Sequence, residues 1–361
     1  MKLASFLTPY IHATWQKKGL LSALLLPLSW ITARVVASRK RRARLAPSLP
    51  SLPTIVVGNI LVGGTGKTPV VVAVIKSLQA RGWTPGVVSR GYGVKIGPSP
   101  RTGQGDLPAT EFGDEPSLIA ASTGVPVAVH PQRDRARQAL IKNFPDVNVV
   151  VSDDGLQHLA LSRDVEIVVQ DARGLGNGRL IPAGPLREPA SKLDEVDFII
   201  DNRAATGSQP LDRGVVVPFC KSRHAKRVSM RLQPTFAENL ATCKRLAWTE
   251  WVARYRSTPL AAVAAIGQPG RFFQTLRDAG LEVAVEQALP DHAPFSASPF
   301  LNLSEDVIAI TAKDAVKCRQ FNDPRVWVVH VEAIFSNPAW LDELEQKLLA
   351  VEYSHGEAMK I

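Results

Sequence analysis

The chain has 361 residues, of which 45% are hydrophobic and 21% are charged, a composition that excludes intrinsic disorder as the default state. Its formal charge of +10 arises in the first 105 residues, which contain no Asp or Glu and 15 Lys and Arg. Cys220, Cys243 and Cys318 lack the spacing of a metal or redox motif, which excludes a disulfide framework and indicates a reducing, cytosolic setting.

Residues 1–45 combine an apolar stretch, Gly19 to Ala33, with a basic cluster over 39–44. A spanning helix needs about 20 apolar residues, and this stretch is shorter and contains Pro27. A secretory signal would end in a small-residue cleavage site instead of a second basic cluster. We therefore predict a basic amphipathic helix in the interface of an anionic membrane. The alternative is a helix that packs on the core. Nucleic acid is not expected as a partner, because no aromatic residues interleave with the cations.

The most specific motif is a phosphate-binding loop. An apolar strand over 54–58 precedes it, and a helical pattern over 68–81 follows it. Glycine N–H groups and the helix N-terminus can hold phosphate oxygens, while Lys67 reaches the terminal phosphates and Thr68 binds Mg²⁺. Leu61 replaces the usual first glycine, so Gly63, Gly64 and Gly66 must make the turn. The predicted ATP-binding residues are Leu61, Val62, Gly63, Gly64, Thr65, Gly66, Lys67 and Thr68. The alternative is a glycine-rich turn without a ligand.

Apolar β-branched runs alternate with helical patterns through the first half of the chain. Strands are predicted over 54–58, 84–89, 125–129, 147–152, 165–170 and 196–200, with helices over 68–81, 115–123 and 132–143. Such near-continuous apolar strands are typical of a parallel sheet that is covered on both faces. We predict a P-loop nucleotide-binding lobe over 46–205, ended by the loop Thr206–Gly214.

A second alternating set follows. Strands are predicted over 260–266, 282–286, 307–311 and 326–331, with helices over 270–279 and 313–320. This set predicts a smaller α/β lobe over 214–331. An amphipathic helix over 338–351 should pack back on the first lobe. The predicted fold is therefore α/β, with a cleft between two lobes.

Two carboxylates, Asp153 and Asp154, follow the strand predicted over 147–152. In phosphate-loop folds an acid at this position holds Mg²⁺, and paired acids repel each other unless a cation lies between them. The alternative is a solvated Asp-Asp-Gly turn.

Four further segments are candidates for binding or catalysis. Arg90–Gly93 and 177–189 follow strands, at the edge where ligands bind in such folds, and arginine suits a phosphate-bearing partner. They could also be ordered surface loops. Asp114 opens a helix, where it could be a simple N-cap. If Asp114 met His292, which lies in a predicted loop of the second lobe, the pair could accept the proton of an alcohol.

Together these segments resemble the tetraacyldisaccharide 4′-kinase family, the lipid A 4′-kinases of Gram-negative bacteria. The segments that carry the resemblance are Val57–Asn59, Gly63–Pro69, Ser89–Gly93, Gly113–Pro116, Asp153–His158, Gly176–Pro189, Pro290–His292 and Thr311–Lys317. The resemblance implies transfer of the ATP γ-phosphate to the 4′-hydroxyl of a lipid disaccharide 1-phosphate. It also implies a two-lobed phosphate-loop fold, bound peripherally at the cytoplasmic face of the inner membrane.

The resemblance also implies roles for single residues. Asp114 is expected to be the base and His292 its partner. The metal-binding residues are expected to be Thr68, Asp153, Asp154 and Glu188, and the substrate side is expected to include Arg90, Tyr92 and Arg187. The expected cofactors are ATP and Mg²⁺. Leu156 stands where the family often has Phe, and Ala293 where a second His is expected.

Two other classes share some of these features. Membrane-surface ATPases of the partitioning type have a similar loop, but with a Lys before the glycine pair, where this chain has Val62. A non-catalytic nucleotide-gated adaptor could also use the basic end to bind a membrane.

Overall fold

The fold is organised around one long mixed sheet. The computed structural model describes residues 15–45, 52–203, 224–293, 295 and 298–358, so the predicted boundary loop Thr206–Gly214 lies outside the described residues. Within those residues, 13 strands join in the order β11-β10-β12-β13-β8-β7-β6-β1-β5-β2-β4-β3, with β9 paired to β8. The strands are β1 (Thr54–Gly58), β2 (Pro85–Ser89), β3 (Arg101–Gly103), β4 (Val127–Val129), β5 (Val149–Asp153), β6 (Val165–Asp171), β7 (Phe198–Arg203), β8 (Lys226–Asn239), β9 (Arg245–Ala247), β10 (Leu260–Ala264), β11 (Val283–Ala288), β12 (Ile308–Thr311) and β13 (Val326–Phe335).

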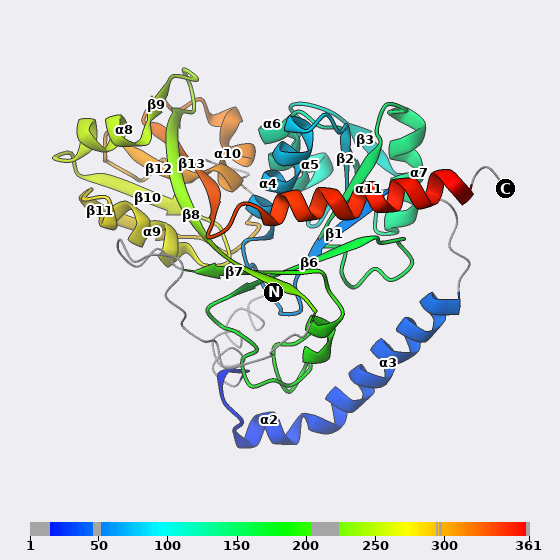
Figure 1. Ribbon diagram of the computed structural model, residues 1–361. Helices are drawn as coiled ribbons and strands as arrows, with labels where there is room; N and C mark the ends of the chain where they lie inside the picture. Colours follow the sequence, from blue (N-terminus) through cyan, green and yellow to red (C-terminus); the bar gives the residue numbers. More distant parts are fainter. Residues whose placement is uncertain (1–14, 46–51, 204–223, 294, 296–297, 359–361) are drawn as a thin grey trace.

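Helices cover the sheet on both sides (Figure 1). They are α2 (Leu20–Leu24), α3 (Leu26–Leu45), α4 (Lys67–Ala80), α5 (Ala109–Phe112), α6 (Asp114–Thr123), α7 (Arg133–Asn143), α8 (Trp248–Tyr255), α9 (Pro269–Asp278), α10 (Ala312–Cys318) and α11 (Trp340–Ala358), with 3₁₀ turns η1 (Ala190–Asp194) and η2 (Arg319–Phe321). Most neighbouring strands are parallel; the antiparallel pairs are β8 with β13, β3 with β4, and β8 with β9. The predicted α/β class with a mainly parallel sheet is confirmed.

The first half of the sheet, β1 to β7, is packed on both faces. Every residue of β1, β2 and β5 is buried, and alternate side chains enter opposite cores. Ile55 and Val57 pack in the core that includes α4, α6 and α11, while Val56 packs in the core that includes α7. Enclosure on both faces favours apolar residues along most of a strand, which explains the near-continuous apolar runs in the sequence.

The second half, β8 to β13, has two cores of its own, one with α8 and α9 and one with α10. Strand β8 joins the halves, because it pairs in parallel with β7 and antiparallel with β13. Its sequence mixes charged and apolar residues and contains Pro234, so no strand was predicted there. Most predicted elements lie within a few residues of the observed ones, but β13 continues to Phe335 and α11 to Ala358.

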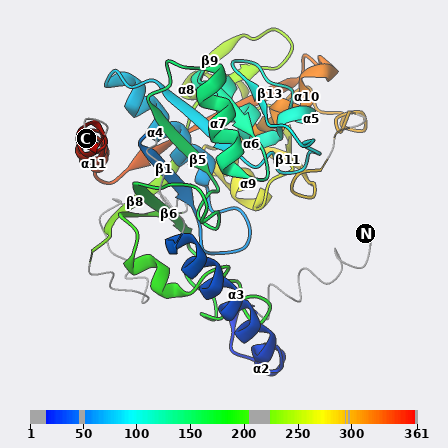
Figure 2. The same cartoon turned by 90° about the vertical axis from the view of Figure 1, so that its right-hand side faces the viewer.

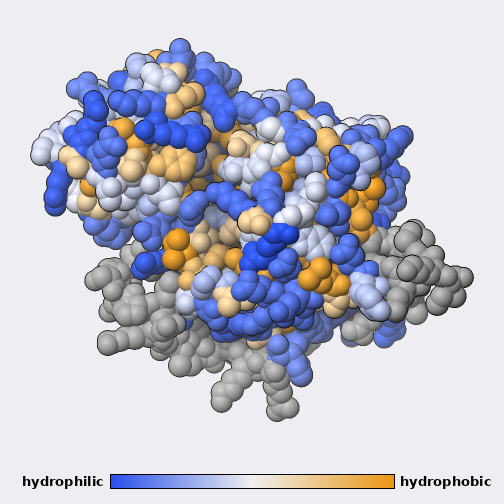
Figure 3. All heavy atoms as spheres, turned by 45° about the horizontal axis from the view of Figure 1, so that its top comes forward, coloured by the Kyte–Doolittle hydropathy of each residue, from blue (hydrophilic) through white to orange (hydrophobic). Residues whose placement is uncertain are grey.

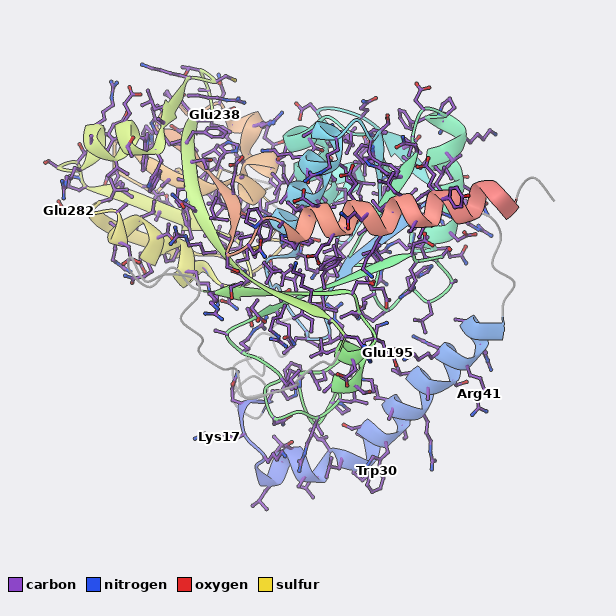
Figure 4. All side chains as sticks on the ribbon, viewed as in Figure 1. Lys17, Trp30, Arg41, Glu195, Glu238 and Glu282 are labelled. Atoms are coloured by element: carbon purple, nitrogen blue, oxygen red, sulfur yellow. The ribbon has the colours of Figure 1, made fainter. Side chains whose placement is uncertain are left out.

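Helices α2 and α3 lie at one end of the protein, outside the layers that cover the sheet (Figures 1 and 2). They are attached through two buried serines, Ser22 and Ser29, whose hydroxyls donate to the carbonyl oxygens of Ala183 (2.5 Å) and Leu180 (2.7 Å). The other side of the pair is exposed, and Figure 4 shows Trp30 and Arg41 pointing away from the body. None of the helices within the described ranges has both the length and the apolar character needed to cross a bilayer.

The view from above is mostly hydrophilic, with separate hydrophobic patches (Figure 3). On α2 and α3, by contrast, apolar side chains are exposed in a row: Leu20, Leu21, Leu24, Leu28, Trp30, Ile31 and Val35. Leu20 is 87% exposed and Leu24 is 76% exposed. Burial of these leucines, as the core-packing alternative requires, is therefore not observed.

Candidate active site

A cavity of about 1130 Å³ opens where the parallel strands end. Strands β7, β6, β1, β5 and β2 are consecutive parallel neighbours, so their carboxyl ends meet at one edge of the sheet. The cavity extends from α3 across the phosphate loop to the segment that carries His292. This is the edge at which open α/β sheets bind their ligands.

The phosphate loop has the backbone conformation that its glycines allow. Gly63 has a φ of 94° and Gly66 a φ of 90°, both in the left-handed region. Gly66 is the N-cap of α4, and a Cβ atom there would lie 2.3 Å from Asn202 Nδ2, so a larger residue would have to displace the Asn202 side chain. Lys67 begins α4, so the positive end of the helix faces the loop.

The burial of Leu61 explains why this position does not carry the usual glycine. Its side chain is 1% exposed and packs in the core, and its backbone forms an antiparallel bridge with Leu186. Of the predicted ATP-binding residues, Val62 to Thr68 line the cavity and Leu61 lies behind it. A side chain at this position supports the loop from inside, where glycine would leave a void.

The two acids that end β5 have different surroundings. Asp154 lies 3.4 Å from Lys67 Nζ and accepts a hydrogen bond from Arg187 at 3.2 Å. Burial would raise the pKa of Asp154, but the charges of Lys67 and Arg187 outweigh it and hold that pKa below its usual value. Asp154 therefore remains ionised next to the phosphate loop.

Asp153 is fully buried, and its Oδ1 has no hydrogen-bond partner among the described residues. Burial, with the negative charges of Glu115 and Asp154, raises the pKa of Asp153 to about 7. A buried carboxylate with one oxygen left without a hydrogen bond among the described residues fits a site that takes Mg²⁺ when nucleotide is bound. No group of three or more His, Cys, Asp or Glu residues in the described part of the chain is arranged to hold a metal alone. Mg²⁺ in nucleotide sites uses one or two carboxylates together with phosphate oxygens, so a complete protein cage is not required.

The raised pKa of Asp153 predicts a pH-dependent stability. Because the folded pKa, about 7, exceeds the unfolded value of 3.8, the stabilising contribution is complete below 3.8 and is lost as pH rises through about 7. Without divalent cations, the melting temperature should fall on the order of 5 °C between about pH 5 and pH 8. Asp153→Asn, neutral throughout, should lack this decrease, and Mg²⁺ with ATP should stabilise the wild type more than the variant at pH 8. Differential scanning fluorimetry in EDTA measures both effects. Equal decreases in the two proteins would contradict this account of Asp153.

Glu188 and Thr68 lie on the same cavity. Glu188 is buried and accepts a hydrogen bond of 2.9 Å from Gln157 Nε2. Burial raises its pKa above the usual value, even though that hydrogen bond opposes the shift. Thr68, Asp154 and Glu188 all line the cavity, and Asp153 lies next to them at the end of β5.

Asp114 and His292 are brought together across the cavity, although 178 residues separate them. His292 Nδ1 lies 3.1 Å from Asp114 Oδ2, and Lys313 Nζ lies 3.3 Å from His292 Nε2. Because lysine can only donate, Nε2 is the acceptor and Nδ1 carries the hydrogen that is donated to Asp114. Tyr92 packs on the imidazole, with ring centroids 4.8 Å apart.

The N-cap of α6 is Gly113, so the alternative that Asp114 is a simple N-cap is wrong. Burial would raise the pKa of Asp114, but the hydrogen bond from His292 and the charges of Lys317 and Lys313 outweigh it and lower that pKa. Asp114 is therefore a carboxylate at neutral pH, with an imidazole and two ammonium groups around it.

The candidate substrate residues lie around the same cavity. Arg90, Tyr92 and Arg187 all line it, and the ring of Tyr92 is exposed. Two residues without a predicted role also lie there. Lys313 contacts Glu115 and Asp291, and Arg133 donates to the carbonyl oxygens of both acids at the end of β5. Lys313 lies in the segment Thr311–Lys317 that carries the family resemblance, which is the signal that could have identified it.

The geometry has a clear chemical meaning. A triphosphate on the loop would meet Lys67 and the acids of β5, and a hydroxyl next to its last phosphate would lie within reach of Asp114. The fold and the site thus define a phosphate-loop enzyme that transfers a phosphoryl group to an alcohol.

Comparison with known proteins specifies the family. A sequence model of the LpxK family, described as tetraacyldisaccharide-1-P 4′-kinase, matches residues 21–349. Tetraacyldisaccharide 4′-kinase of Bordetella parapertussis is 52% identical over 347 residues, covering 94% of this chain and 96% of that protein. The enzyme of the same name from Vibrio cholerae is 43% identical and covers 94% of this chain and 95% of its own length. The chain belongs to the tetraacyldisaccharide 4′-kinase family, as predicted, and is a kinase that acts on a hydroxyl group.

The fold agrees with this assignment. A crystal structure of LpxK from Aquifex aeolicus in complex with ATP superposes with a TM-score of 0.74 at 24% sequence identity, covering 92% of this chain and 99% of that one. Membership of this family favours the kinase over the partitioning ATPase and the adaptor.

Proposed function

We propose that this protein transfers the γ-phosphate of ATP to the 4′-hydroxyl of a tetraacyldisaccharide 1-phosphate, in the synthesis of lipid A. The observation that carries the proposal is that the phosphate loop and His292, whose Nδ1 lies 3.1 Å from Asp114, line one cavity. ATP consumption measured in mixed micelles with and without the lipid acceptor tests it. Turnover that does not depend on the acceptor would overturn the proposal.

The side chains of the cavity divide the chemistry among them. The ammonium of Lys67 stabilises negative charge on the transferring phosphate, and Asp114 accepts the proton of the sugar hydroxyl as that oxygen attacks. His292 orients Asp114 by donating its Nδ1 hydrogen to the carboxylate. We assign Mg²⁺ to Thr68, Asp153, Asp154 and Glu188; it would neutralise charge on the β- and γ-phosphates. Arg90, Tyr92 and Arg187 are placed to contact the acceptor.

We propose that the segments divide these tasks. Residues 46–205 bind the nucleotide, residues 214–331 supply His292, and residues 1–45 meet the membrane. The exposed apolar row of α2 and α3, followed by the basic residues of the same helix, suits the cytoplasmic surface of an anionic bacterial inner membrane. Ile31, Thr32, Val35, Val36 and Arg39 of α3 also line the cavity, so a lipid could reach the phosphate loop along this helix.

Membrane binding can be tested without removing a segment. The triple variant Leu20→Ser, Leu24→Ser, Trp30→Ser should reduce sedimentation with anionic vesicles by about tenfold or more, because three exposed apolar side chains are lost from the interface. ATP-induced thermal stabilisation should not change. A matched control is Leu349→Ser with Tyr353→Ser on α11, where the side chains are also exposed. A triple variant that sediments like the wild type would contradict the membrane role of α2 and α3.

A further inference from the structure

The phosphate loop is held from outside by an arginine that neither the sequence motif nor the proposed mechanism uses. Arg173 follows β6, and its guanidinium donates to the carbonyl oxygen of Val62 at 3.1 Å and to that of Gly64 at 2.9 Å. Asp171, whose side chain is fully buried, accepts from Arg173 Nε at 2.9 and 3.0 Å. The guanidinium is therefore fixed on one side by a carboxylate, while its other nitrogens contact the loop.

Holding these carbonyl groups determines where the N–H groups point. In a planar trans peptide the C=O and N–H bonds are opposed, so an outward carbonyl of Val62 directs the N–H of Gly63 inward. The same holds for Gly64 and the N–H of Thr65. Asn59 and Asn202 hold the carbonyl groups of the other two peptides in the same way. They donate to the carbonyl oxygens of Gly63 (3.0 Å) and Thr65 (2.9 Å). Four successive N–H groups are thus directed toward the phosphates before ATP arrives.

The same carboxylate also contacts the second half of the protein. Gln268 is the N-cap residue of α9, and its Nε2 donates to Asp171 Oδ2 at 3.1 Å. The preceding residue approaches the loop itself, because a Cβ on Gly267 would lie 3.6 Å from the backbone nitrogen of Gly64. Asp171 therefore joins the arginine that supports the phosphate loop to a segment 97 residues away in the sequence.

We propose that Asp171 and Arg173 are positioning residues that align the phosphate loop, and that Gln268 makes this alignment depend on the second half of the protein being seated on the loop. The effect is on the N–H groups of the loop, and no atom of the three side chains needs to touch a phosphate. The proposal rests on the binding of ATP at this loop and is independent of the roles given to Asp114 and His292.

The protein contains a matched control for a purely structural role. Asp323 and Arg325 form the same type of pair, with Arg325 Nε and Nη2 donating to the carboxylate at 3.1 and 2.8 Å. Arg325 also donates to loop carbonyl oxygens, those of Leu303 and Phe300, at 2.7 and 3.3 Å. None of these residues lines the cavity. Loss of Arg325 should therefore affect stability without affecting ATP.

Arg173→Ala and Arg325→Ala form the first test. Arg173→Ala should weaken ATP binding about 10- to 100-fold, as expected for the loss of two charged hydrogen bonds that align several others, and should lower kcat as well. ATP-induced thermal stabilisation, measured without lipid, should fall accordingly. Arg325→Ala should lower the melting temperature but keep the wild-type response to ATP. Guanidinium at millimolar concentration should partly restore ATP binding in Arg173→Ala.

Arg173→Lys provides a second test, in case the alanine variant does not fold. It keeps the charge but can contact one carbonyl group at a time, so its ATP affinity should lie between those of the wild type and Arg173→Ala. A wild-type response to ATP in either Arg173 variant, or equal losses in Arg173→Ala and Arg325→Ala, would overturn the proposal. Lost turnover with normal ATP binding would also overturn it, and would point to the Asp114–His292 pair.

A double-mutant cycle tests Gln268. Gln268→Ala should lower kcat about tenfold in the wild type and have no further effect in Arg173→Ala, because Asp171, the partner of Gln268, then no longer holds an arginine on the loop. Asp171→Asn should resemble Arg173→Ala. Independent, multiplicative losses from Gln268→Ala and Arg173→Ala would overturn the link between the second half and the loop.

Discussion

Lys67→Ala should reduce phosphoryl transfer by about 10²- to 10³-fold or more while the protein stays folded. The ammonium of Lys67 lies 3.4 Å from Asp154, at the start of α4, where we propose that it would face the phosphates of a nucleotide. Its removal leaves the loop backbone unchanged, because other side chains hold the loop carbonyl groups. Steady-state turnover with the lipid acceptor measures the loss, and the thermal unfolding profile checks the fold.

Lys76 provides the control for this experiment. It lies on the same helix, and its ammonium pairs with Glu332 at 2.9 Å on the surface, where such pairs contribute about 0–1 kcal/mol. Lys76→Ala should therefore retain wild-type turnover. More than a few per cent of activity in Lys67→Ala would show that the loop does not act on a transferring phosphate.

Asp114→Ala and His292→Ala should each lower kcat by about 10²- to 10⁴-fold with little change in ATP affinity. A sugar hydroxyl attacks efficiently when its proton is removed, and the carboxylate held by His292 is the acceptor we assign to it. If the two residues act as one unit, as we propose, the double variant should be hardly slower than either single variant. Turnover at saturating ATP measures the effect on kcat, and ATP-binding measurements give the effect on ATP affinity.

His330→Ala is the matched control, because His330 also lies near a carboxylate, 3.9 Å from Glu238, but does not line the cavity. It should keep wild-type turnover. Fully multiplicative losses in Asp114→Ala and His292→Ala would mean separate roles for the two residues. Wild-type turnover in Asp114→Ala would remove it from the chemistry altogether.

The first half of the fold could be predicted from sequence because its strands are enclosed. Burial on both faces requires a continuous apolar run, as in β1 and β5, and the glycine turn before α4 is equally distinctive. Strand β8 lacks such a signal, since its burial alternates irregularly and its two partners approach it from different halves of the sheet. Its place depends on contacts between residues far apart in the chain.

The candidate site shows the same limit. Motif residues such as Lys67 and Asp154 could be proposed because their chemistry and spacing are characteristic. Arg173 and Asn202 could not, because they lie at the ends of β6 and β7 and contact backbone carbonyl groups of the phosphate loop. Only the order of the strands in the sheet brings them there. The pairing of Asp114 with His292 was expected on family resemblance; their distance of 3.1 Å depends on how β8 and β13 place the second half.

The segment from Leu180 to Arg187 is bound at both ends. Near its start, the carbonyl oxygens of Leu180 and Ala183 accept hydrogen bonds from the serine hydroxyls of α2 and α3. Near its end, the backbones of Pro185 and Arg187 form hydrogen bonds with those of Val62 and Ile60, just before the glycines of the phosphate loop. If α3 rests on a bilayer, the segment from Leu180 to Arg187 sets the distance between the lipid surface and a phosphate on the loop. The enzyme would then select acceptors by the distance of their hydroxyl from the lipid surface. A hydroxyl carried one sugar higher or lower would miss the phosphate, whatever its acyl chains.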